Sequence, residues 1–168
     1  LKDIAAPVGV TPAMIHYYFG SKHELLESVV NQAVAPVSSA IQQLREQPET
    51  EATLLNVIAL VLSGNGRSSE AEPLAERSLK ITQQLHPGDH PAVAQRLNSL
   101  ATVRQRLGRA EQAEPMFAQV LDMCRRLYEG DHHMVSASLA NLANVQEDLG
   151  RLREAEALYA QALEMDRR

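Results

Sequence analysis

The chain has 168 residues, of which 45% are hydrophobic and only 4% are aromatic, and it contains no tryptophan. Its formal net charge of −5 argues against a general nucleic-acid coat protein. A single cysteine excludes a disulfide framework within the chain and favours a reducing compartment. The apolar runs are too short to span a bilayer. We therefore predict an all-α protein, rich in helix-forming residues, that is cytoplasmic and has no membrane association.

The first 35 residues predict short helices separated by turns. Residues 1–8 form an amphipathic pattern, and Gly9 then permits a sharp turn. Thr11 and Pro12 are a typical N-cap and first-turn pair for a second helix. This order of helix, turn and helix is the helix-turn-helix plan, in which the second helix enters the major groove of DNA.

The spacing of apolar and turn residues from Ile4 to Leu26 resembles the DNA-binding domain of TetR-type repressors. The match begins after the family's first helix, so the predicted helix-turn-helix is truncated. The resemblance implies that base edges, sugars or phosphates are contacted by Thr11, Pro12, Ala13, His16, Tyr17 and Lys22.

Residues 36–49 predict a transition between two regions. They contain Pro36 and Pro48, and the polar residues after Pro48 mark a boundary. In TetR-type repressors a larger ligand-binding and dimerisation domain follows the DNA reader. Here a different pattern begins at about residue 50.

A repeat of 42 residues occupies residues 50–168. The segment Leu107-Gly108-Arg109 falls on Leu149-Gly150-Arg151, and Ala71-Glu72-Pro73 falls on Ala113-Glu114-Pro115. Three copies in register predict three equal structural units that stack on one another.

Each unit reads as two helices, because its apolar residues recur at helical spacing. A Gly-Arg pair separates the helices, and Gly88 or Gly130 ends the second one. We expect Asp89 and Asp131 to be N-caps of the next hairpins, with Pro91 in the first turn.

Two residue types recur at fixed places in the repeat. Small residues that allow close helix approach stand in the first helices at Ala59, Ala101 and Ala143. Glutamates stand in the second helices at Glu72, Glu114 and Glu156. We interpret the glutamates as a solvated face rather than as acid–base pairs.

The repeat resembles the tetratricopeptide repeat, in the 42-residue form of kinesin light chains and related bacterial proteins. The matching motifs are Gly88-Asp89-His90-Pro91, Leu97-Asn98-Ser99-Leu100-Ala101, Gly108-Arg109 and Ala113-Glu114-Pro115-Met116-Phe117. The resemblance implies a right-handed superhelical stack of three helical hairpins, an α-solenoid. It also implies a concave groove, lined by the first helices, that binds an extended peptide or a partner's helix.

The resemblance places these residues in the groove: Gln95, Asn98, Thr102, Gln105, Ala137, Asn141, Asn144 and Glu147. Asparagine can both donate to and accept from a peptide backbone, which suits weakly sequence-selective binding. The alternative is that these asparagines are ordinary solvated helix surface. No Lys or Arg stands at the positions that would clamp a C-terminal carboxylate.

The leading functional hypothesis is a protein-interaction scaffold with a peptide or protein partner. The alternative is a TetR-like DNA-binding regulator that uses the repeats as a sensor or dimerisation arm. We predict no enzyme activity and no cofactor, and we interpret Asp131, His132 and His133 as capping residues rather than metal ligands. Leu158 and Leu163 lie at an open end, which predicts further repeats or self-association.

Overall fold

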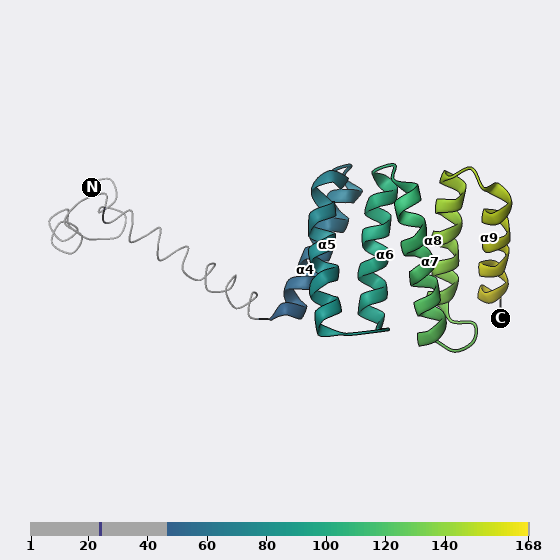
Figure 1. Ribbon diagram of the computed structural model, residues 1–168, viewed down its shortest axis with the longest axis horizontal. Helices are drawn as coiled ribbons and strands as arrows, with labels where there is room; N and C mark the ends of the chain where they lie inside the picture. The colour runs from purple at the N-terminus through teal and green to yellow at the C-terminus, as the bar shows by residue number, and fades with distance from the viewer. Residues whose placement is uncertain (1–23, 25–46, 168) are drawn as a thin grey trace, which may run out of the picture. The chain divides into compact units, whose positions relative to one another are not determined.

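In a computed structural model of the protein, the described residues are Glu24 and residues 47–167. The predicted helix-turn-helix, with its six DNA-contacting residues, and the transition up to residue 46 lie outside this part. Residues 47–167 form six helices and no strand, which confirms the all-α prediction for them. In chain order (Figure 1) the helices are α4 (Pro48–Gly64), α5 (Ser68–Leu85), α6 (Pro91–Arg106), α7 (Ala110–Leu127), α8 (His133–Asp148) and α9 (Leu152–Asp166).

The helices pair into three hairpins, as the repeat predicts. Helix α4 packs on α5, α6 on α7 and α8 on α9. The second helix of each hairpin also packs on the first helix of the next, in the pairs α5–α6 and α7–α8. A single hairpin cannot bury its own apolar face, so this stacking provides the hydrophobic core.

Glycine ends the first helix of each hairpin in a left-handed conformation. The φ angles of Gly66, Gly108 and Gly150 are 78°, 75° and 75°, a region that side-chain-bearing residues rarely adopt. After Gly108, the Arg109 backbone N–H donates to the Arg104 carbonyl at 3.0 Å, which closes the helix end. The predicted role of the Gly-Arg pair is confirmed.

The N-caps of α6 and α8 are histidines, so the prediction of Asp89 and Asp131 was wrong. The Nδ1 atom of His90 accepts a hydrogen bond from the Ala92 backbone N–H at 3.2 Å, and His132 caps α8 in the same way. A capping residue must directly precede the first helical residue, and each aspartate stands one position too early.

Asp89 instead connects two helical segments. It accepts a hydrogen bond from Arg126 Nη2 at 3.0 Å, which ties the loop before α6 to the end of α7. The hydrogen bond from Arg126 lowers the pKa of the Asp89 carboxyl below its usual value.

We expect His90→Ala to reduce the free energy of unfolding by about 1 kcal/mol, because a helix N–H loses its acceptor. The His90 ring also stacks on His86, with ring centroids 3.8 Å apart. His90→Asn restores an acceptor but not the stacking, so urea denaturation of the three proteins separates the two effects. Equal destabilisation by alanine and asparagine would show that the cap contributes little.

Candidate peptide-binding face

The predicted groove residues lie on the first helices of the second and third hairpins. We call the following set the amide face: Gln95, Asn98, Thr102 and Gln105 on α6, and Ala137, Asn141, Asn144 and Glu147 on α8. Four of the eight are half-buried, namely Asn98, Thr102, Gln105 and Asn141, and the other four are exposed. No side chain of the set is fully buried, so all eight are open to solvent.

A direct amide–amide hydrogen bond crosses the amide face. The Nδ2 atom of Asn141 donates to Oδ1 of Asn98 at 2.8 Å, which joins α8 to α6. Each asparagine amide has two N–H donors and an oxygen with two lone pairs, so this one bond uses only part of their capacity. The pair therefore offers donors and acceptors side by side.

Two other α6 residues of the face, Thr102 and Gln105, also make hydrogen bonds. Gln105 Nε2 donates to the Asp148 carboxylate at 2.5 Å, a second bridge between α6 and α8. The Thr102 hydroxyl donates to the Asn98 backbone carbonyl within its own helix at 2.9 Å. Gln105 and Asp148 fix the spacing of the two helices, whereas Thr102 contributes mainly its methyl group to the surface.

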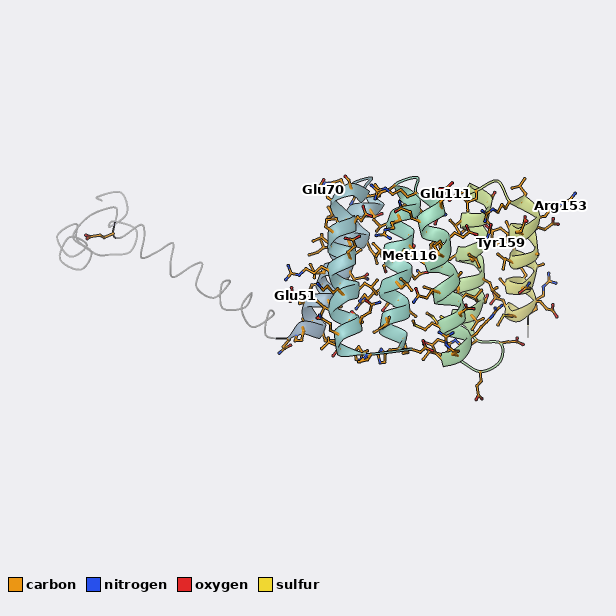
Figure 2. All side chains as sticks on the ribbon, in the orientation of Figure 1. Glu51, Glu70, Glu111, Met116, Arg153 and Tyr159 are labelled. Atoms are coloured by element: carbon orange, nitrogen blue, oxygen red, sulfur yellow. The ribbon has the colours of Figure 1, made fainter. Side chains whose placement is uncertain are left out.

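Tyr159 of α9, labelled in Figure 2, contacts the α8 part of the amide face. Its hydroxyl donates to Asn144 Oδ1 and lies 3.3 Å from a carboxylate oxygen of Glu147. Burial raises the pKa of Tyr159, and the negative charge of Glu147 acts in the same direction. The phenol therefore stays protonated and acts as a donor at neutral pH.

Two residues beside this face were not in the predicted set. Asn56 on α4 stands 42 residues before Asn98; it is buried, and its Oδ1 accepts no hydrogen bond from the described residues. Arg96 is also buried, which lowers its pKa, and it donates to the Thr53 hydroxyl at 3.0 Å. The 42-residue offset was the available signal for Asn56, whereas the sequence gives no sign that Arg96 turns inward.

The recurring glutamates form bridges between hairpins, so their interpretation as a solvated face was wrong for two of the three. Arg109 donates to Glu72 at 2.7 Å, and Arg151 donates to Glu114 at 2.5 Å. The Glu72 and Glu114 side chains are 17% and 25% exposed. The second and third Gly-Arg turns thus reach back to the second helix of the preceding hairpin, while Glu156 is exposed.

A metal site, an accessible cysteine or a membrane-spanning helix in residues 47–167 would each indicate another kind of function. No group of three or more His, Cys, Asp or Glu side chains there is placed to hold a metal ion. Cys124 is fully buried, beside the Ser138 hydroxyl. None of the described helices combines the length and the hydropathy that crossing a membrane requires.

Comparison with protein families identifies the repeat. The model of the tetratricopeptide repeat matches residues 49–125 and 96–168. The chain belongs to the tetratricopeptide-repeat family. Proteins built from this repeat generally serve as protein-interaction scaffolds rather than as enzymes, and the fold described above is the α-solenoid of that family.

Solved structures share this fold. Structures of nearly identical TPR-like repeats, attributed to a kinesin light chain of Podosopora anserina, match with a TM-score of 0.66 and 23% identity over 72% of this chain. BtubC (BKLC) from P. vanneervenii matches with a TM-score of 0.68 and 22% identity over 83% of the chain. The chain spans 57% of the length of each. The TPR domain of Arabidopsis FLU matches with a TM-score of 0.59 and 18% identity, over 69% of this chain and 94% of that domain.

A second family model covers the start of the chain. The model of bacterial regulatory proteins of the tetR family matches residues 1–29. This match agrees with the resemblance noted in the sequence, but the comparisons do not favour the DNA-binding regulator over the scaffold. No curated protein matches the chain in sequence.

Proposed function

We propose that the amide face binds a peptide segment of another protein in extended form, mainly through the peptide backbone. The observation that carries this proposal is the Asn98–Asn141 pair, which bridges two hairpins and retains both donor and acceptor capacity. An extended backbone offers alternating N–H and C=O groups, which such a pair can satisfy without reading a side chain. Membership of a scaffold family supports the same conclusion.

The charge of the face favours a particular kind of peptide. Glu147 and Asp148 are exposed at the C-terminal end of α8. Two carboxylates at one end of the face would attract a Lys or Arg of the peptide. The amide face itself carries no exposed cation among its eight members, so an acidic peptide terminus is a poor fit.

Replacement of Asn98 and Asn141 by alanine is expected to weaken peptide binding by about tenfold or more, because hydrogen bonds to the backbone contribute about 1 kcal/mol each. The probe is a peptide selected on the wild-type chain from a displayed library of random sequences. Its dissociation constant, measured by titration calorimetry, is expected to be in the micromolar range, at about −8 kcal/mol.

Gln83→Ala with Gln119→Ala is the matched control, because both side chains are exposed on second helices. The control should bind the selected peptide like the wild type. Circular dichroism should show that both double variants are folded. If the peptide binds the Asn98→Ala/Asn141→Ala protein unchanged, the amide face is not the binding site.

A further inference from the structure

The two ends of the stack carry exposed apolar residues within the described part of the chain. On α4, Leu54, Ile58 and Val61 are 42%, 48% and 57% exposed. On α9, Leu163 is 57% exposed. Apolar residues grouped at surfaces of this kind indicate sites of interaction. The interfaces between hairpins inside the stack show which kind of surface packs on each of these two ends.

The interface between α7 and α8 shows which residues meet when hairpins stack. Ser138 of α8 donates to Cys124 of α7, with 3.4 Å between the oxygen and the sulfur. Further along the two helices, Gln146 donates to Glu114 at 2.8 Å. Helical periodicity then places the α8 residues Ser138, Leu142 and Val145 against the α7 residues Phe117, Leu121 and Cys124. All six of these side chains are buried.

The residues of α9 that stand 42 positions after the α7 side of this interface are its repeat equivalents. Tyr159, Leu163 and Asp166 stand where α7 has Phe117, Leu121 and Cys124. Leu121 is only 4% exposed because α8 covers it, whereas its counterpart Leu163 lies open. Two depressions, of about 380 and 470 Å³, lie at this surface, and Tyr159 and Leu163 line both.

The residues of α4 that stand two repeats before the α8 side of this interface are its equivalents. Leu54, Ile58 and Val61 stand 84 residues before Ser138, Leu142 and Val145. The residues that occupy these positions on α6, Arg96, Leu100 and Val103, are buried against the preceding hairpin. The exposed apolar stripe of α4 therefore has the register of a helix that packs on a second helix.

The repeat positions that form ion pairs between hairpins also occur at the two ends of the stack. Arg109 pairs with Glu72, and Arg151 pairs with Glu114, in each case 37 residues apart. Arg67 and Glu156 hold the same repeat positions at the two ends of the series. Glu156 is exposed, and within the described part of the chain Arg67 pairs locally, with the exposed Glu70 at 2.6 Å. A positive group at one end thus matches a negative group at the other.

We infer that two copies of this chain associate head to tail, with α4 of one copy packed on α9 of the other. The head surface consists of Leu54, Ile58, Val61 and Arg67, and the tail surface consists of Glu156, Tyr159, Leu163 and Asp166. The contact repeats the α5–α6 and α7–α8 interfaces, with the Arg67–Glu156 pair between copies. Because the two surfaces differ, each added copy leaves one head and one tail open, and the assembly grows with concentration.

The test blocks one surface at a time with a charge at an exposed position, which should not disturb folding. Ile58→Glu blocks the head and Leu163→Glu blocks the tail. Sedimentation velocity of the wild-type full chain should show an average mass that rises with concentration. Each variant alone should remain monomeric. An equimolar mixture should form a species of twice the monomer mass and nothing larger, because only one head and one tail remain.

Each other outcome overturns the inference. A wild-type chain that is monomeric at all concentrations has no such contact. If Ile58→Glu still dimerises while Leu163→Glu does not, the tail pairs with itself. If the chain is monomeric and Ile58→Glu lowers its melting temperature, residues before α4 in the same chain cover the stripe.

The charge pair gives an independent measurement. Glu156→Arg and Arg67→Glu should each weaken association of the full chain by about fivefold or more, through lost attraction and new repulsion. The variant that carries both changes should regain most of the wild-type association. A double variant as weak as the single variants would show that these two residues do not meet between copies.

Discussion

Phe117→Ala is expected to reduce the free energy of unfolding by about 3–5 kcal/mol, the usual cost of removing a buried phenylalanine ring. Phe117 is 1% exposed, on α7 in the middle hairpin, and it belongs to the continuous core of the stack. Small domains are stable by only about 5–15 kcal/mol, so this loss would leave the protein marginally folded at best. Urea denaturation followed by circular dichroism measures it.

Tyr159→Ala is the matched control for Phe117→Ala, since it changes an aromatic residue at the same repeat position one hairpin later. Tyr159 is only half-buried, because the described residues do not cover it in the way that α8 covers Phe117. Its replacement should cost clearly less, on the order of the 1 kcal/mol of one hydrogen bond. Measurements at low protein concentration keep self-association out of the comparison. Equal costs at the two positions would mean that the end of the stack is as well packed as its middle.

The sequence predicts the helices and their stacking because the determining signals are local and repeated. Apolar spacing defines each helix, and Gly66, Gly108 and Gly150 end the first helices because only glycine adopts their φ angles without strain. Three registered copies of one unit then imply that each hairpin packs on the next. None of these steps requires knowledge of a side-chain contact between hairpins.

The errors concern residues whose environment depends on a neighbouring hairpin or on a single step of register. Glu72 looks like a surface residue on its own helix, yet Arg109 of the next hairpin covers and pairs with it. Asp89 was predicted as the N-cap, but His90 holds that position, because the helix begins one residue later than the sequence pattern indicated. Spacing within one helix contains neither kind of information.

The candidate site was predicted as a set of residues but not as an arrangement. Asn98 and Asn141 were both expected on the groove side, but nothing in the sequence indicates that their amides bond to each other. Their separation of 43 residues is one more than the repeat, as is that of the bonded pair Gln105 and Asp148. The burial of Asn56 follows from the same packing of first helices, which sequence spacing alone does not define.

Ala101→Leu is expected to cost about 1–3 kcal/mol of unfolding free energy, because added methyl and methylene groups have no room in a packed interior. Ala101 is 0% exposed, and Ala59 and Ala143 are equally buried at the same position of their hairpins. This alanine position therefore determines how closely the helices approach in all three units.

Ala137→Leu is the control for this substitution, since Ala137 is exposed on α8. Its effect on stability should stay within about 0.5 kcal/mol, as for most surface changes away from special features. Both variants are compared with the wild type by urea denaturation. If Ala101→Leu proved as harmless as Ala137→Leu, the hairpins would be able to move apart, and the close contact of helices at this position would not be a requirement of the fold. A cost confined to Ala101→Leu would instead explain why alanine stands at this position in every copy of the repeat.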